Sequence, residues 1–212
     1  MSAFDQRRIE DLQKLRQLAA HAPSRLKLGR VSGNPPHEIE LELMFKTAPS
    51  QNYPNAVQER TVVVITMPVK YPLSPPSATI KTPILHPNVY SSGLICLGIK
   101  WLPASGLDLL VKRIIQIITF DSTVLNEQSP ANRNALEWYR RAQRQHPRAF
   151  PTDSALLVSP DQPKKMTWSN IPSDVAKMVV SCTSCGARLS VPSGKTGKAK
   201  CPRCNTTFDV RT

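Results

Sequence analysis

A single cysteine stands apart from the other four in this sequence. Cys96 is the only cysteine before residue 182, and it follows Asn88 by eight positions in "NVYSSGLIC". A cysteine thiolate is a strong nucleophile, and an asparagine amide can donate a hydrogen bond to an oxyanion that forms at the sulfur. A lone cysteine between apolar neighbours is also a common core residue. The local sequence therefore leaves both interpretations of Cys96 open.

The histidine in the same stretch is a candidate general base. His86 is followed by Pro87 in a loop crowded with prolines, so we expect it to brace the loop through hydrogen bonds rather than to move protons. Gly93 and Gly98 flank Cys96, and this pattern favours a rigid, irregular loop over the interior of a strand.

The other four cysteines form two close pairs near the C-terminus. The pairs are Cys182-x2-Cys185 and Cys201-x2-Cys204, with fifteen residues between them. Each pair has the spacing with which two thiolates bind one metal ion from a tight turn, and four thiolates leave no open coordination position. The pattern predicts one structural zinc ion per chain. Two disulfides or four free thiols are the alternatives, and both are less favoured where thiols stay reduced.

This cysteine-rich segment resembles a zinc ribbon of the small bacterial and archaeal kind. Asn205 stands where such ribbons usually have glycine, and asparagine tolerates the left-handed backbone conformation that this turn needs. "RLSVP" and "TTFDV" are expected to be the paired strands beside the cysteines. Lys195, Lys198 and Lys200 lie between the pairs, where they could contact phosphates or an acidic protein, or simply face solvent.

Hydrophobic periodicity predicts the elements that must position Cys96. Residues 3–21 read as an amphipathic helix with a basic polar face. Apolar runs predict strands at 25–31, 35–47, 60–68 and 77–82, and their short connections favour an antiparallel meander. A long ordered loop is expected to follow, as far as residue 107.

Two helices are predicted after this loop. Residues 107–120 are strongly apolar and predict a buried helix, whereas 130–146 has a thinner apolar face and should lie on the surface. Ser129 is the candidate N-cap of the second helix, with Pro130 at its first position. The fold class is therefore α+β. We divide the chain into an α+β domain at 1–148, a Pro-rich semi-rigid linker at 149–178 and the zinc ribbon at 179–212.

Composition limits the cellular location and the classes of partner that we expect. The start, "MSAFDQRRIEDLQ", has no apolar signal core, and no apolar run approaches the ~20 residues that cross a bilayer. We therefore expect a cytoplasmic protein with no membrane partner. The net charge of +13 is spread along the chain. It is weak evidence for nucleic-acid binding, because basic proteins also attract acidic protein partners.

Four motifs in order make residues 1–146 resemble a ubiquitin-conjugating enzyme. They are "YPLSPP" at 71–76, "HPN" at 86–88 with Cys96 in "GLICL", "KWLPA" at 100–104 and "SPANRNA" at 129–135. The resemblance implies that Cys96 accepts ubiquitin or a ubiquitin-like protein as a thioester from an activating enzyme and passes it to an amine. Asn88 would stabilise the oxyanion or hold the loop near it. Supporting positions would be His86, Pro87, Leu97, Trp101, Glu127 and Ser129.

The resemblance also implies protein partners. Arg7, Arg8, Lys14 and Arg16 on the first helix would dock the activating enzyme. Leu73, Pro103 and Ala104 would form a patch that faces a ligase, which in turn brings the protein substrate.

Three features depart from the common eukaryotic pattern. The run from Cys96 to Trp101 is short, Ser129 stands where an acidic residue is frequent (Glu127 is close enough to substitute), and the zinc ribbon is an unusual appendage. By analogy these indicate a bacterial or archaeal relative in a ubiquitin-like conjugation pathway, with anti-phage defence as one setting.

Two alternatives to a conjugating enzyme remain. One is a non-catalytic binding module on the same fold, which the presence of Cys96 and Asn88 disfavours. The other is a nucleic-acid-binding protein that acts through the ribbon, which leaves the motif order unexplained.

Overall fold

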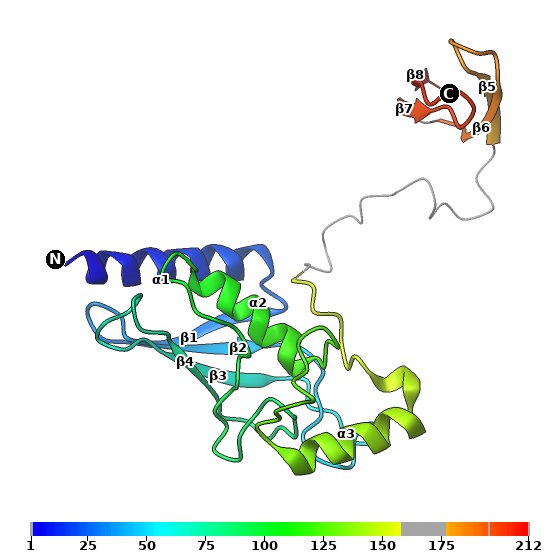
Figure 1. Ribbon diagram of the computed structural model, residues 1–212. Coiled ribbons are helices and arrows are strands. Elements are labelled where there is room, and N and C mark those ends of the chain that lie inside the picture. The colour runs from blue at the N-terminus through cyan, green and yellow to red at the C-terminus, as the bar shows by residue number, and fades with distance from the viewer. Residues whose placement is uncertain (1, 158–176, 195, 212) are drawn as a thin grey trace. The chain divides into compact units, whose positions relative to one another are not determined.

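The computed structural model describes residues 2–157, 177–194 and 196–211 (Figure 1). Its internal contacts divide the chain into two compact units, Met1–Gln162 and Pro163–Thr212, and each unit is described by itself.

Part of the predicted linker falls outside the described residues. This holds for Pro160, Pro163 and Pro172, and also for Lys195 in the ribbon. Within the described part of the chain, no helix is long and apolar enough to cross a lipid bilayer.

A four-stranded antiparallel sheet forms the centre of the first unit, in the order β1-β2-β3-β4. Its strands are β1 (Leu26–Ser32), β2 (Glu38–Leu43), β3 (Thr61–Thr66) and β4 (Ser77–Ile80). Alternation along β2 buries Ile39, Leu41 and Leu43 and turns the intervening glutamates to the other face. The predicted meander and the α+β class are confirmed.

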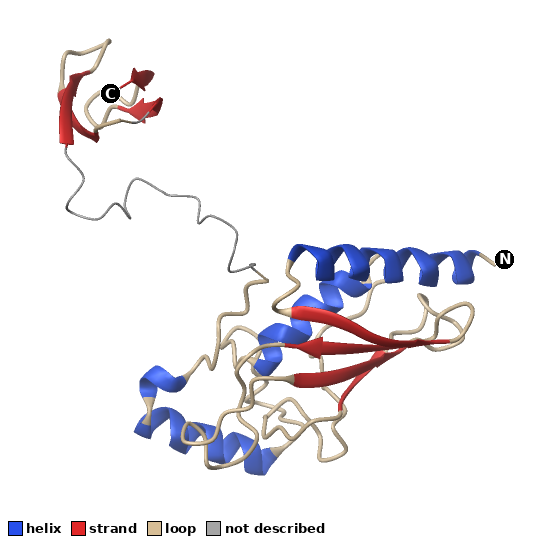
Figure 2. Ribbon diagram, turned by 180° about the vertical axis from the view of Figure 1, so that it is seen from behind, coloured by secondary structure: helices blue, strands red, loops and turns tan. Residues whose placement is uncertain are grey.

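Two helices pack on the apolar face of this sheet (Figure 2). α1 (Ala3–His21) has the predicted bounds and begins with a capping box formed by Ser2 and Asp5. It presents Leu12 and Leu15 to the core. α2 (Leu107–Ile118) is buried along most of its length, so it fixes the point at which the long loop after β4 ends.

The third helix, α3 (Arg133–Gln145), starts later than predicted. Asn132 is its N-cap, because the side-chain oxygen of Asn132 accepts the backbone N–H of Ala135 at 3.0 Å. Ser129 is therefore not the N-cap, and Pro130 is not the first helical residue. A short 3-10 helix, η1 (Pro147–Ala149), follows α3.

A second, aromatic core lies under α3. α2 ends at Ile118 rather than at the predicted Phe120, since the backbone turns left-handed at Phe120 with φ of 60°. That turn directs the Phe120 ring against the aromatic side chains that follow. The cluster contains Phe120, Trp138, Tyr139 and Phe150.

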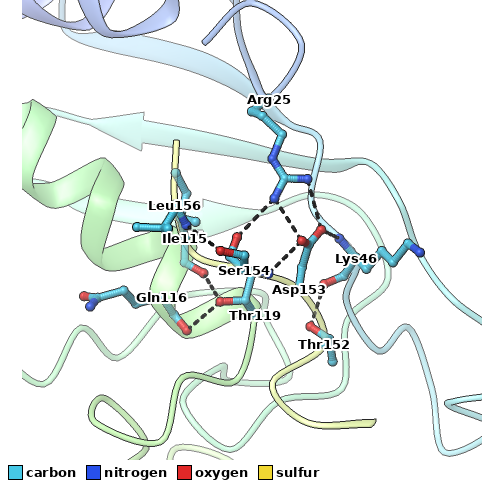
Figure 3. A network of polar contacts seen from close by, with 9 residues as sticks. All are labelled: Arg25, Lys46, Ile115, Gln116, Thr119, Thr152, Asp153, Ser154 and Leu156. Atoms are coloured by element: carbon cyan, nitrogen blue, oxygen red, sulfur yellow. Dashed lines mark hydrogen bonds and ion pairs between the residues drawn. The ribbon is translucent and has the colours of Figure 1, made fainter. Parts of the chain in front are cut away.

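After η1 the chain returns to the sheet (Figure 3). The carboxylate of Asp153 accepts two hydrogen bonds from Arg25, at 2.9 and 3.2 Å, and one from the backbone N–H of Lys46 at 2.8 Å. The hydroxyl of Thr152 donates to the carbonyl of Lys46 at 2.6 Å. Residues 149–157 were expected in the linker, but these bonds make them part of the first unit.

Two β-hairpins make up the described part of the second unit. β5 (Lys177–Ser181) pairs with β6 (Arg188–Pro192), and β7 (Thr196–Lys200) pairs with β8 (Thr207–Arg211). The expected pairing of "RLSVP" with "TTFDV" is wrong, because each of these strands pairs instead with the strand on the other side of its own cysteine pair. Closing such a short turn costs less chain entropy than closing a long loop.

Candidate active site and metal centre

The loop that carries Cys96 folds back on itself. The backbone N–H of Cys96 donates to the carbonyl of Asn88 at 2.7 Å, and Val89 and Ile95 form an isolated antiparallel bridge. Ile95 is buried, whereas Cys96 is partly exposed and its thiol is free. The step of eight residues from Asn88 to Cys96 is thus the length of a small hairpin, and Cys96 is not a core cysteine.

The side chain of Asn88 is fully buried and uses both ends of its amide. Its nitrogen donates to the carbonyl of Val124 at 3.0 Å and, at a longer 3.5 Å, to the carbonyl of Cys96. Its oxygen accepts the backbone N–H of Asn126 at 3.1 Å. Asn88 therefore fastens the Cys96 loop to the segment before α3, and the bond nearest the sulfur is the weakest of the three.

His86 is also fully buried, with its ring centroid 4.2 Å from that of Phe120. Its Nδ1 accepts the backbone N–H of Asn88 at 2.9 Å. Burial lowers the pKa of His86 to about 3, so the ring is neutral at neutral pH and carries its proton on Nε2. The lone pair of Nδ1 is occupied, which leaves His86 unable to act as a base. The adjacent carbonyl of Pro87 accepts the N–H of Asn132 and so ties the start of α3 to this loop.

The rim beyond Cys96 is short and partly exposed. The carbonyl of Leu97 accepts a hydrogen bond from the guanidinium of Arg113 on α2 at 3.1 Å. The chain then turns at Gly98, whose φ of 63° is left-handed. The rim ends at Trp101, whose indole N–H donates to the carbonyl of Pro72 at 2.7 Å. That last bond joins the two proline-rich loops at this end of the unit.

The four ribbon cysteines lie at the tips of the two hairpins, and their sulfurs all stand within 4.8 Å of one another. The sulfur of Cys182 is 3.7 Å from that of Cys204, and the sulfur of Cys185 is 3.6 Å from that of Cys201. Four sulfurs that each bind zinc at about 2.3 Å in a tetrahedron stand about 3.8 Å apart. The donor set and its spacing therefore fit one zinc ion with a closed shell. Asn205 adopts the left-handed conformation expected of it, with φ of 58°.

Comparison with known families agrees with both sites. The family model described as ubiquitin-conjugating enzyme matches residues 13–151. This chain belongs to the ubiquitin-conjugating enzyme family. A second model, described as the second zinc ribbon domain of FORGETTER1, matches residues 170–212, so the conjugating-enzyme domain is followed by a zinc ribbon.

Curated relatives of this family member align over part of its length. Ubiquitin-conjugating enzyme E2 14 of Arabidopsis thaliana is 35% identical over 89 residues, which are 36% of this chain and 53% of the relative. Ubiquitin-conjugating enzyme E2 of African swine fever virus is 26% identical over 123 residues, 53% of this chain and 54% of the relative. The chain thus spans about half the length of the curated relatives it matches. The structure of human ubiquitin-conjugating enzyme E2 G1 aligns over 55% of this chain and 98% of that one, at 22% identity and a TM-score of 0.43.

In this conjugating-enzyme domain, the expected supporting positions Glu127 and Ser129 lie at the surface before α3. Glu127 is paired with Arg140 at 3.0 Å, and about half of each side chain is exposed. Ser129 sits in a turn that Asn126 closes, because the side chain of Asn126 bonds both the N–H and the carbonyl of Ser129. Neither position presents an unpaired carboxylate.

The basic residues predicted on α1 fall into two groups. Arg7 donates to Asp11 and to the carbonyls of Pro103 and Ser105, and the buried Arg8 donates to the carbonyl of Pro68. These bonds tie both arginines to loops elsewhere in the fold. Lys14 and Arg16, further along α1, are both exposed, and the ammonium of Lys14 also pairs with the carboxylate of Asp11 at 3.6 Å.

The three residues of the expected ligase-facing patch are exposed, with Leu73 at 62%. The bond from Trp101 to Pro72 and the bonds from Arg7 bring their two loops to the same end of the unit. Sequence reasoning missed two exposed apolar side chains on neighbouring segments, Phe4 and Val69. Their exposure depends on which face of the fold they occupy, and no periodic signal marks it.

Other contributors were missed because they act through the backbone. Val124 and Asn126 offer Asn88 a carbonyl and an N–H, and main-chain groups leave no sequence signature. Asp11 could have been found. It lies on the apolar stripe of α1 beside Leu12, four residues after Arg7, and it is fully buried with bonds to Arg7 and to the hydroxyl of Tyr71.

Proposed function

We propose that this chain carries ubiquitin or a ubiquitin-like protein as a thioester on Cys96 and transfers it to an amine. The observation that supports this most directly is the position of Cys96. It is a partly exposed thiol in a loop whose backbone is fixed by Asn88, inside a domain of the conjugating-enzyme family. The proposal makes the chain an acyl transferase rather than a binding module.

The transfer takes two steps. The thiolate of Cys96 attacks the thioester carbonyl on an activating enzyme, a new C–S bond forms, and the thiolate of the activating enzyme leaves. An amine nitrogen then attacks the Cys96 thioester, a C–N bond forms, the Cys96 thiolate leaves, and the nitrogen loses a proton to solvent.

A thioester is an activated acyl donor, so this chemistry depends chiefly on positioning and on stabilising the oxyanion. That agrees with a site in which the one nearby histidine is buried and neutral. Within this proposal, Asn88 supplies the amide nearest the reacting carbonyl and holds the loop. Pro87, Leu97 and Trp101 fix the walls around it.

The partners follow from the same proposal. They are an activating enzyme docked near Lys14 and Arg16, the carried protein, a protein substrate, and a ligase at the patch of Leu73, Pro103 and Ala104. The short rim and the attached ribbon support a setting in a prokaryotic ubiquitin-like conjugation pathway, including one directed against phage. Cytoplasmic conditions suit a reaction that needs a free thiol.

Zinc would be held by Cys182, Cys185, Cys201 and Cys204, as one ion per chain. When bound, it supplies a structural cross-link between the two hairpins and no open site for chemistry. The ribbon residues would then serve recruitment.

The proposal is tested with ATP, a cognate activating enzyme and its ubiquitin-like protein. The wild-type chain should gain a band shift that thiol reductant removes. Cys96→Ser should either abolish the shift or turn it into a reductant-resistant ester. Failure of the wild type to form a reductant-sensitive adduct on Cys96, with partners known to be active, would refute the proposal.

A further inference from the structure

The rim beside Cys96 is held at few points. Within the described residues, positions 97–101 take part in no backbone–backbone hydrogen bond, and 98–100 are exposed. At the far end, the indole of Trp101 bonds the carbonyl of Pro72. Side chains from elsewhere in the fold must therefore keep the rim in place.

At the near end the tie is Arg113. Its Nε donates to the carbonyl of Leu97 at 3.1 Å from the middle of α2, a helix anchored in the core. Burial lowers the pKa of Arg113 and the charge of Asp121 raises it, and an arginine guanidinium stays ionised in either case. Hydrogen bonds with an ionised donor are about twice as strong as neutral ones. The Leu97 carbonyl is therefore held more firmly than a solvent contact would hold it.

This tie acts directly on the reacting residue. The backbone nitrogen of Cys96 lies 2.7 Å from the carbonyl oxygen of Asn88, to which it donates, and the next residue, Leu97, is held by Arg113. The cysteine is thus fixed on both sides. The left-handed turn at Gly98 comes next. A Cβ atom there would lie 3.6 Å from a terminal nitrogen of Arg113, so the guanidinium packs against the turn itself.

We infer that Arg113 is a positioning residue for transfer from Cys96. The inference rests on the proposed function. A thioester on Cys96 must meet the attacking nitrogen at about 3–3.5 Å in the correct orientation. A mobile rim would let the thioester adopt many orientations, few of which allow attack. We take the activating enzyme to support the loop during loading. During discharge to a small free amine, this chain alone supports it, so loss of Arg113 affects discharge first.

The test uses the full chain with Arg113→Gln and Arg113→Lys, and Arg141→Gln as the matched control. Arg141 is an exposed arginine on α3. Discharge of the preformed thioester to saturating free lysine should slow about tenfold in Arg113→Gln, because misplaced reactants lose rate steeply. Arg113→Lys should lie between, since it keeps the charge but lacks the planar fork. Loading should match the wild type, and Arg141→Gln should match it in both steps.

A second readout needs no conjugation activity. Lys100 is an exposed residue of the rim, so a more mobile rim should fit the active site of trypsin more readily and be cut faster there. In Arg113→Gln the cut at Lys100 should appear earlier than in the wild type or Arg141→Gln, and ahead of the other cuts in the first unit. If the wild type forms no thioester, the proposed function fails while this cleavage still tests the tie. Unchanged cleavage at Lys100, or equal slowing of loading and discharge, would overturn the inference.

Discussion

The side-chain oxygen of Asn88 accepts the backbone N–H of Asn126 at 3.1 Å, while its nitrogen bonds the carbonyl of Val124. One buried amide thus joins the Cys96 loop to the segment before α3. Its two hydrogens are both committed, one firmly to Val124 and one weakly to Cys96. An oxyanion at the sulfur can receive the second hydrogen only if the Cys96 carbonyl gives it up.

Substitution of Asn88 tests both of its roles. Asn88→Ala leaves the carbonyl of Val124 and the N–H of Asn126 without partners, so the free energy of unfolding should fall by about 1–3 kcal/mol. Below the unfolding temperature, discharge of the thioester should slow more than loading, because only discharge lacks support from the activating enzyme. Denaturant unfolding and single-turnover assays measure the two effects. Equal loss in loading and discharge would make Asn88 a folding residue alone.

His86 should stay neutral well into the acid range. Its folded pKa is about 3, whereas an unfolded histidine titrates near ~6.5. Between these values the unfolded chain binds a proton that the folded chain does not, so this residue makes stability fall as pH falls through that window. NMR titration should show no protonation of the His86 ring at pH 5. A midpoint close to the ordinary histidine value would contradict the buried, neutral assignment.

The ion pair between Arg25 and Asp153 should also make stability depend on pH, through hydrogen bonds to a charged group and not through the burial of a neutral one. Burial raises the pKa of Asp153, but the hydrogen bonds from Arg25 and Lys46 outweigh it and leave the pKa below its usual value. The stabilisation is therefore complete above the unfolded value of about 3.9 and is lost as pH falls through the lower folded value. Asp153→Asn should cost about 1–2 kcal/mol of unfolding free energy at neutral pH.

The control for this experiment is Glu59→Gln, which removes a nearby exposed carboxylate. The gap between wild type and Asp153→Asn should narrow in acid, while the control stays close to wild type throughout. Denaturant unfolding at neutral and acid pH measures this. A gap that keeps its size in acid would mean that the charge of Asp153 contributes nothing.

Zinc removal should affect the ribbon alone. Metal analysis should find about one zinc per chain, as four cysteine ligands require. A strong chelator should abolish the ordered NMR signals of residues 177–211 and leave those of the first unit unchanged, because a segment this small depends on its metal for folding. Cys96→Ser should keep its zinc, whereas Cys201→Ser should bind it more weakly. Disulfides in freshly prepared, reduced protein would contradict the assignment.

The sequence predicted the elements that rest on local signals. The apolar stripe predicted α1 with its bounds, and the alternation in β2 predicted the buried face of that strand. It misplaced the start of α3, because Ser129 and Asn132 are both good caps and the choice depends on the bond from Asn132 to Pro87, far away in sequence.

The candidate site divides in the same way. Cys96, Asn88 and the four ribbon cysteines stood out by type and spacing. The hydrogen bonds of Arg7 and Arg8 to loops of their own domain could not be predicted. In the sequence, a charged residue on a polar helix face looks the same whether it contacts a partner or another part of its own chain. The tail at 149–157 looked like a linker because it is attached by an ion pair, by backbone bonds and by scattered apolar contacts such as that of Phe150, and none of these forms a periodic apolar run.

The two hairpins of the ribbon share one geometry. Gly186 and Asn205 occupy equivalent left-handed positions, and their N–H groups bond the carbonyls of Cys182 and Cys201 at 2.9 and 2.8 Å. In chelation terms, each hairpin is a complete bidentate ligand, and the ribbon is two such ligands joined in tandem. Metal uptake can therefore proceed stepwise. Damage to one hairpin leaves the other a competent, though weaker, chelator, so loss of a single cysteine should lower zinc affinity by degrees rather than end it.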